Sequence, residues 1–155
     1  MRTLLALVLV SGMARAEPVP VAVFDFALID TSLEGELNGP REDEAARLDA
    51  LGHALRAAYA EAPGYEIVDI APVRDRARAQ DLQRCGGCAT AMAEEVGAVL
   101  AVTGTVQKVS NLILNINLYL EGPEGPRVMS ADIRGNTDES WSRGLDWLIR
   151  NRLDL

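Results

Sequence analysis

The sequence has very little of the chemistry on which most enzymes rely for proton transfer and nucleophilic attack. His53 is the only histidine in 155 residues, and it flanks the apolar stripe of a predicted helix. No Gly-x-Ser-x-Gly elbow is present to support a Ser-His-Asp triad. The glycine patterns that hold dinucleotides and nucleotide phosphates are missing as well. The sequence therefore favours a protein that is not an enzyme and that carries no cofactor.

Cysteine is scarce, and the only two form the segment Cys85-Gly86-Gly87-Cys88. A zinc site would need two further ligands, and haem attachment would need a histidine where Ala89 stands. A C-x-x-C at a helix start can act as a thiol-disulfide oxidoreductase, because the helix end stabilises a thiolate. In thioredoxin-like enzymes, however, the motif directly follows an early core strand, whereas here it follows a polar helical segment. We predict a structural disulfide, with redox chemistry and metal binding as the alternatives.

Long apolar runs are missing after the first sixteen residues, since no later segment reaches the roughly 18 residues of a membrane span. Residues 1–16 combine a basic start, an apolar stretch at Leu4–Val10 and the small residues of Ala14-Arg15-Ala16. This layout is typical of a secretory signal peptide that is cleaved before Glu17, and a buried amino-terminal helix is the alternative. We therefore expect a periplasmic mature protein, residues 17–155, with no membrane span.

Basic side chains are outnumbered by acidic ones, 15 to 23, so the formal net charge is −8. Such a surface repels nucleic acid and anionic lipid, and it favours solubility, cationic partners or metal ions. One segment is especially acidic and contains Asp30, Glu34, Glu36, Glu42 and Asp43. Carboxylate oxygens there could hold a hard cation such as calcium, although the spacing is not that of an EF-hand. A solvated loop without metal is the simpler interpretation.

The hydrophobic pattern predicts elements in the order β-α-β-α-β-β-β-α. The expected strands cover 19–26, 65–70, 98–109, 112–120 and 127–133. Helices are expected over 44–59, over 72–82 with a short continuation at 85–96, and over 138–153, while 27–43 is expected to be a polar loop. A tight turn is predicted at Ser110-Asn111, because asparagine tolerates positive φ.

This order of elements predicts an α/β (α+β) fold with one mixed five-stranded sheet and helices packed on it. The first three strands are joined through helices, so they should be parallel with right-handed crossovers. The last two strands should close as a meander. We expect one domain over residues 17–155, because that length suits a single hydrophobic core.

Polar residues follow several strands at what should be the same edge of the sheet. The ends of strands one, three and five meet there, and ligands of open α/β sheets bind outside such an edge. The candidate binding edge consists of Asp30, Thr31, Ser32, Glu34, Lys108, Asn111, Arg134, Asn136, Asp138 and Glu139. Capping and turn roles are the alternative, since Thr137 or Asp138 can cap the final helix.

Trp147 is a candidate interface residue, because it lies away from the face of the last helix that carries Trp141, Leu145 and Leu148. A large aromatic side chain on an outer face often anchors a protein–protein contact. The alternative is that Trp147 covers a neighbouring loop.

Four segments, Val21–Phe26, Asp30–Gly35, Val106–Asn117 and Asp132–Trp141, resemble a domain-of-unknown-function family of small secreted proteobacterial proteins. The strand order and Val102–Val106 are also similar, more distantly, to the TolB amino-terminal domain and to the soluble domain of the curli-secretion lipoprotein. Those relatives bind partners in the cell envelope and are not enzymes. The resemblance implies a non-enzymatic periplasmic binding or accessory module with an envelope or periplasmic protein partner. The resemblance also points to an accessory role in a periplasmic quinoprotein oxidation system.

Overall fold

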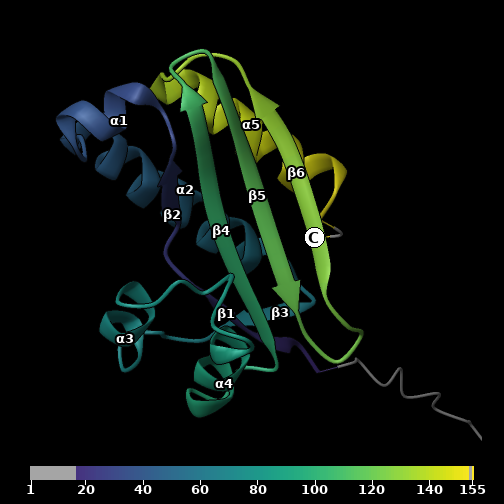
Figure 1. Ribbon diagram of the computed structural model, residues 1–155. Helices are drawn as coiled ribbons and strands as arrows, with labels where there is room; N and C mark the ends of the chain where they lie inside the picture. The colour runs from purple at the N-terminus through teal and green to yellow at the C-terminus, as the bar shows by residue number, and fades with distance from the viewer. Residues whose placement is uncertain (1–16, 154) are drawn as a thin grey trace, which may run out of the picture.

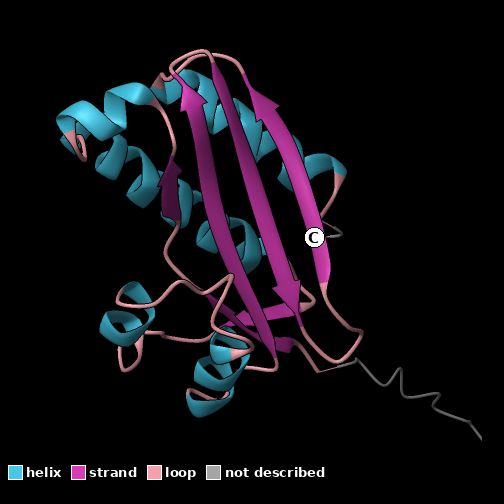
Figure 2. Cartoon of the chain, in the orientation of Figure 1, coloured by secondary structure: helices cyan, strands magenta, loops and turns pink. Residues whose placement is uncertain are grey.

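A single mixed sheet with helices on both faces is the centre of the structure (Figures 1 and 2). The computed structural model describes residues 17–153 and 155, so the predicted signal peptide lies outside the described residues. The sheet contains β1 (Val19–Val23), β2 (Ala27–Asp30), β3 (Tyr65–Ile67), β4 (Leu100–Ser110), β5 (Ile113–Glu121) and β6 (Arg127–Ile133). The helices are α1 (Leu33–Asn38), α2 (Glu42–Glu61), α3 (Arg74–Arg78), α4 (Cys88–Glu95) and α5 (Asp138–Asn151).

The strand order confirms the mixed α/β sheet expected from the sequence. The main path runs β3-β1-β4-β5-β6, and β2 also pairs with β4. The pairs β1–β3, β1–β4 and β2–β4 are parallel, whereas β4–β5 and β5–β6 are antiparallel. Parallel neighbours follow from the helical crossovers, and the closing meander follows from the two short turns.

The two faces of the sheet have separate cores, because side chains alternate along each strand. Val21 and Val23 of β1 pack with α2 and α5, in the core that also holds Trp141. Ala22 and Phe24 point the other way, into a smaller core with α3 and α4. Figure 1 shows α2 and α5 behind the long strands, with α3 and α4 beside the lower part of the sheet. The sheet thus joins an upper and a lower part of the molecule.

The first strand is interrupted, which the sequence pattern over 19–26 did not predict. β1 pairs with 100–102 of β4, and β2 pairs with 105–108 further along the same strand. Residues 24–26 between them turn away, and the Phe26 ring lies across Gly104. A Cβ at Gly104 would come within 2.3 Å of that ring, so only glycine leaves room for it. This interruption separates the strand into two parts and leaves space beside β4.

The segment 27–43 is the largest correction to the sequence-based elements. It was expected to be a polar loop, but it contains β2, α1 and the first turn of α2. Its apolar residues are too few to show a strand or helix period by themselves. The short β2 owes its extended form to pairing with β4, which is a tertiary contact.

The turn between β4 and β5 also differs from its prediction. Ser110 belongs to β4, and the turn residues are Asn111 and Leu112. Asn111 has negative φ, because no described non-glycine residue has positive φ. The register shifts between Lys108 and Ser110, so a bulge supplies the twist that a left-handed turn residue would otherwise provide. Leu112, expected to face the core, is exposed in this turn.

Other boundaries are shorter than expected. The helix predicted over 72–82 is only α3, and the strand predicted over 65–70 is only β3. The rest of the predicted strand, 68–70, has no regular structure, and the rest of the predicted helix consists of turns, a bend and irregular chain. Both lie in the lower part of the molecule, where polar residues are frequent and the apolar pattern is weak.

The predicted disulfide is present and closes the loop before α4. Cys85 and Cys88 are bonded, with Cα atoms 5.7 Å apart. Gly86 and Gly87 have φ of 69° and 97°, so the loop needs residues that accept left-handed conformations. Cys85 is exposed and Cys88 is half-buried at the start of α4. The disulfide therefore fixes a surface loop at the entry of a helix.

Replacing both cysteines, Cys85→Ser with Cys88→Ser, should lower the free energy of unfolding by about 2 kcal/mol, because closing a four-residue loop restricts the unfolded chain only modestly. Urea denaturation of the variant measures this difference. Wild-type protein under reductant should match the variant. Insulin reduction by the wild-type protein that disappears in the variant would instead assign the pair a redox role.

Candidate functional site

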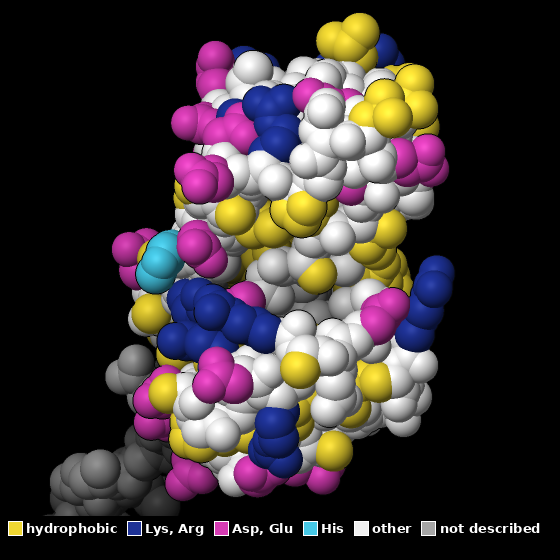
Figure 3. Space-filling model, turned by 60° about the vertical axis from the view of Figure 1, so that its left-hand side comes forward, with side chains coloured by type: hydrophobic (Ala, Val, Ile, Leu, Met, Phe, Trp, Pro, Cys, Tyr) yellow, Lys and Arg dark blue, Asp and Glu magenta, His cyan; other side chains and the backbone are white. Residues whose placement is uncertain are grey.

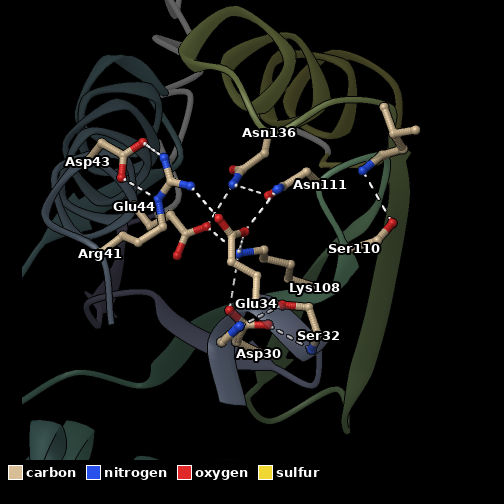
Figure 4. Close-up of polar contacts among 12 residues, drawn as sticks. Asp30, Ser32, Glu34, Arg41, Asp43, Glu44, Lys108, Ser110, Asn111 and Asn136 are labelled. Carbon is tan, nitrogen blue, oxygen red and sulfur yellow. Dashed lines mark hydrogen bonds and ion pairs between the residues drawn. The ribbon is translucent and has the colours of Figure 1, made fainter. Parts of the chain in front are cut away.

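The three loops predicted to share one edge meet at the upper end of the sheet (Figure 4). They follow the ends of β2, β4 and β6. Contacts among the loops and the start of α2 bring together Asp30, Thr31, Ser32, Glu34, Lys108, Asn111, Asn136 and Asp138. The parallel arrangement of β2 and β4 causes this convergence, since their carboxyl ends lie at the same edge.

Lys108 is the centre of this group, which we call the Lys108 cluster. Its side chain has no exposed surface, and its Nζ donates to Glu44 Oε1 over 2.6 Å. The same Nζ lies 3.1 Å from Asp30 Oδ2 and 3.2 Å from Glu34 Oε2. Burial lowers the pKa of Lys108, but the hydrogen bonds to the carboxylates outweigh burial and raise the pKa above its ordinary value. The amine therefore stays charged although it is buried.

Two asparagines connect the cluster to the turn after β4 and to the loop before α5. Asn111 Nδ2 donates to Glu34 Oε2 over 2.8 Å, and Asn136 Nδ2 donates to Glu44 Oε1 over 2.6 Å. Asn136 Nδ2 also donates to Asn111 Oδ1 over 3.0 Å. The hydrogen bonds from Asn111 and Lys108 hold the pKa of Glu34 below its ordinary value.

Arg41 and Arg47 form the outer side of the cluster. Arg41 donates to Glu34 over 2.8 Å and to both carboxylate oxygens of Asp43. Arg47 donates to Asp43 over 2.9 Å and to Asp138 over 2.6 Å. The hydrogen bond from Arg41 is the main reason that the pKa of Asp43 lies well below its ordinary range. α2 is thus linked to α1 and to the start of α5.

Sequence reasoning found Lys108 but missed Glu44, its closest partner. Both residues stand at positions where the hydrophobic period calls for an apolar side chain. Lys108 follows the buried Val106 by two residues on a strand, and Glu44 precedes Leu48 and Leu51 by four and seven residues on a helix. Opposite charges at two core positions are a signal of a buried pair, and that signal was available from the sequence.

A close approach between α1 and β2 positions Asp30. Its Oδ1 accepts from the backbone N–H of Ser32 over 2.8 Å, and Ser32 Oγ accepts from Gly35 N, capping α1. A Cβ at Gly35 would lie 2.5 Å from the Asp30 carboxylate, so this position needs a residue without a side chain. Burial raises the pKa of Asp30, but the hydrogen bonds with Ser32 and Lys108 outweigh burial and lower it.

Two residues of the candidate binding edge lie apart from the Lys108 cluster. Arg134 is exposed, and its backbone carbonyl accepts from Ser140 Oγ. Glu139 is on the first turn of α5 and pairs with Arg143 over 2.8 Å. The strand-end argument located the loops correctly, but it could not determine which side chains of each loop point inward.

The polar groups of the Lys108 cluster bind one another, and two of them have almost no exposed surface, although Glu44 Oε2 is buried without a hydrogen-bond partner. Lys108 is 0% and Glu44 1% exposed. Buried ion pairs of this kind connect elements, and removal of one partner leaves an uncompensated charge. The acidic segment is used in the same way, since Asp30, Glu34 and Asp43 all bind cations of the chain. Among the described residues, no group of three or more His, Cys, Asp and Glu side chains is arranged to hold a metal ion.

A second group of charges surrounds Asp25, in the interruption between β1 and β2. Arg56 and Arg78 donate to its two carboxylate oxygens, the latter over 2.7 Å, and Arg74 Nε lies 3.6 Å away. Arg56 also donates to the backbone carbonyl of Val23 over 3.1 Å. Burial raises the pKa of Asp25, but the hydrogen bonds from Arg56 and Arg78 outweigh burial and lower it. Three arginines thus converge on one carboxylate.

Beside Asp25 is a cleft of about 570 Å³, which we call the waist cleft. Its walls come from 25–29, from α2 and α3, from the loop 79–83 and from 103–105 of β4. In Figure 3 this face is hollowed between the upper and lower parts of the molecule, and basic side chains gather at its lower rim. Apolar lining residues include Leu28, Leu48 and Ile70. The interrupted strand therefore opens a cavity in which apolar walls meet arginines.

Two polar atoms at the walls of the waist cleft are buried and have no hydrogen-bond partner in the structure. They are Arg74 Nε and Thr105 Oγ1. The neighbouring Thr103 is satisfied, because its Oγ1 accepts from Gln83 Nε2 over 3.0 Å. A buried unsatisfied group costs about 1–3 kcal/mol, so such atoms at a cavity wall point to a polar occupant. Sequence reasoning named none of these residues, since nothing in their spacing brings them together.

Comparison with known proteins gives a matching family and similar solved structures. The sequence profile of a family described as "Protein of unknown function (DUF2380)" matches residues 19–153. Among curated proteins none matches the sequence. The C-terminal domain of LpoB from Salmonella enterica is 15% identical, with a TM-score of 0.48 over 77% of this chain and 83% of that chain.

None of the helices within the described residues has both the length and the hydrophobicity that a membrane crossing requires. The resemblance to a domain-of-unknown-function family is thus confirmed, while the more distant likeness to TolB stays a prediction.

The substitution Lys108→Met should lower the free energy of unfolding by about 3–5 kcal/mol, because it leaves Glu44 buried without its partner. Urea denaturation measures the loss. Lys108 is also the only lysine, so an amine-acylating reagent should modify it only after unfolding, which mass spectrometry detects.

The matched control is Gln107→Met, at the adjacent exposed position of the same strand, which should change stability by less than about 0.5 kcal/mol. The double substitution Lys108→Met with Glu44→Leu should recover part of the loss, since it removes both buried charges. A loss below about 1 kcal/mol for Lys108→Met would contradict the central role of this amine.

Proposed function

Since the chain belongs to the family of proteins of unknown function whose profile it matches over residues 19–153, we propose its role from its geometry: an exported, non-enzymatic binding module of the cell envelope that holds an anionic ligand in the waist cleft. The observation that carries this proposal is that two buried polar atoms at the walls of that cleft, Arg74 Nε and Thr105 Oγ1, have no hydrogen-bond partner, although Arg74 Nε lies 3.6 Å from Asp25. An anionic ligand in the cleft could accept a hydrogen bond from either atom, because each can donate one.

The class of ligand follows from the remaining walls. Arg74 and Arg78 supply cationic donors among the lining carboxylates Asp25, Asp49 and Asp81, and arginine binds carboxylate and phosphate groups with paired hydrogen bonds. Leu28, Leu48 and Ile70 supply apolar surface nearby. The fitting ligand is therefore an anionic oxygen group attached to an apolar body. A small molecule fits a cleft of this volume better than a folded partner does.

Binding without catalysis is supported by the chemistry of the lining. The lining side chains include no histidine, cysteine, serine or lysine. Asp25 is a poor general base at neutral pH, because its two arginine hydrogen bonds hold its pKa below the ordinary range. His53 is exposed on α2 and does not line the cleft. The thiol-disulfide alternative would have to act elsewhere, since the cysteines do not line the cleft either.

Export is the part of the proposal that rests on the first sixteen residues alone. The Ala14-Arg15-Ala16 site predicts a mature amino terminus at Glu17. Amino-terminal sequencing of the protein recovered from the periplasm should give Glu17 as the first residue. Periplasmic protein that retains Met1, or protein confined to the cytoplasm, would contradict export by this signal.

Octanoate and octyl phosphate should bind the wild-type protein, whereas octanol and octylamine should bind much more weakly, because only the first two carry an anion. Arg74→Gln should weaken the binding of the anions by about tenfold or more, the effect of losing a charged hydrogen bond. Thr105→Val should also weaken binding without lowering stability, since it removes a hydroxyl that has no partner in the free protein. Isothermal titration calorimetry measures all of these affinities.

The matched control for Arg74→Gln is Arg76→Gln, two residues along α3. Arg76 is exposed and pairs with Glu95 outside the cleft, so its removal should leave the affinity unchanged. The fold should tolerate the loss of Arg74, because Asp25 keeps Arg56 and Arg78. Equal affinities of octanoate for the wild-type protein, Arg74→Gln and Arg76→Gln would overturn the assignment of this cleft.

A further inference from the structure

Among the described residues, β6 is an edge strand of the sheet, and its charged residues are Arg127 and Asp132. It pairs with β5 through seven consecutive residues without a bulge, and it is the last strand of the main path. β6 contains neither proline nor lysine, which are common protections against strand pairing. The exposed backbone groups of such an edge can pair with an added strand.

A groove of about 520 Å³ runs beside this edge, between β6 and α5. It is lined by 130–134 and by Ser140, Arg143, Gly144 and Trp147. Gly144 brings the helix close to the strand, since a Cβ there would lie 2.9 Å from Ile133. Trp147, one helical turn further on, is 45% exposed and forms the apolar part of the groove. Its indole therefore borders the space that the next strand of the sheet would occupy.

The groove is locally basic on a molecule whose formal net charge is −8. Arg134 and Arg143 line it, and Asp132 is the only acid that does. The Asp132 carboxylate already accepts from Asn115 Nδ2 over 2.8 Å. Charge complementarity therefore favours an occupant that carries carboxylates.

We propose that β6 and the groove beside it form a docking site for an extended segment of a partner protein, which adds a strand to the sheet. Main-chain hydrogen bonds between the segment and β6 supply one part of the affinity. Apolar side chains of the segment that pack against Trp147 supply another. Acidic side chains of the segment pair with Arg134, and with Arg143 in exchange for its exposed ion pair with Glu139. This site lies on α5 and β6 and shares no residue with the waist cleft, so the two proposals can fail separately.

A second copy of the chain fits this groove less well. Each copy has an excess of acidic side chains, so two copies repel each other at long range. Pairing β6 with another β6 would also bring the arginines of the two grooves near each other. The favoured occupant is therefore a segment of different sequence, with apolar and acidic side chains on one face.

The probe is a capped octapeptide, Val-Thr-Glu-Thr-Val-Thr-Glu-Thr, which as a strand places valine and glutamate on the same face. It should bind the full mature chain, as measured by tryptophan fluorescence and by calorimetry. Trp147→Ala should weaken binding by about tenfold or more, since exposed aromatic anchors carry much of such an interface. Leu37→Ala is the matched control, because it removes another highly exposed apolar side chain, far from this groove on α1.

Two altered peptides test the main-chain pairing with β6 and the charge pairing with the arginines of the groove. An octapeptide with N-methylated backbone amides cannot pair with β6 and should lose binding, and one with lysine in place of glutamate should bind more weakly. The proposal is overturned if the N-methylated peptide binds equally well, if Trp147→Ala leaves the affinity unchanged, or if the first peptide does not bind at millimolar concentration. Sedimentation that shows a dimer dependent on Trp147 would overturn it in favour of a second copy.

Discussion

The ion pair between Lys108 and Glu44 is the interaction on which the upper part of the structure depends. It joins β4 to α2 inside the core, and the surrounding hydrogen bonds extend the link to β2, to the turn after β4 and to the loop before α5. A charge buried to this degree is tolerated only when its partners are in place. The cluster therefore selects one arrangement of these segments, and alternative packings would leave the amine unpaired.

The interruption between β1 and β2 has a different consequence. A continuous strand along β4 would have covered the space beside Thr103 and Thr105. Because residues 24–26 turn away, Asp25 faces three arginines and a cleft opens at the boundary of the two cores. The cluster at the strand ends pairs its charged groups with one another, whereas the cleft at the interruption is open and has Arg74 and Arg78 in its walls.

Much of the framework could be predicted from the sequence. The alternation of β5, the helical spacing on α2 and α5, and the right-handed crossovers led to the correct mixed sheet. The convergence of the loops at 30–34, 108–111 and 134–139 followed from parallel strand ends, and it is confirmed by their contacts. Arg134 and Glu139 were grouped with the cluster because loop position says nothing about side-chain direction. Glu44 was missed because it entered only as the first residue of the helix predicted over 44–59.

The sequence by itself determined which faces are buried, where most elements lie, the order of the elements along the chain and the pairing of the two cysteines, because hydrophobic period and residue spacing act locally. Only the tertiary structure decided that 27–43 contains a strand and a helix, that Asp25 meets three arginines, and that Trp147 borders an open sheet edge. Each of these depends on contacts between segments far apart in the chain. The free energy of such contacts comes from burial and charge pairing in three dimensions, and local periodicity does not encode it.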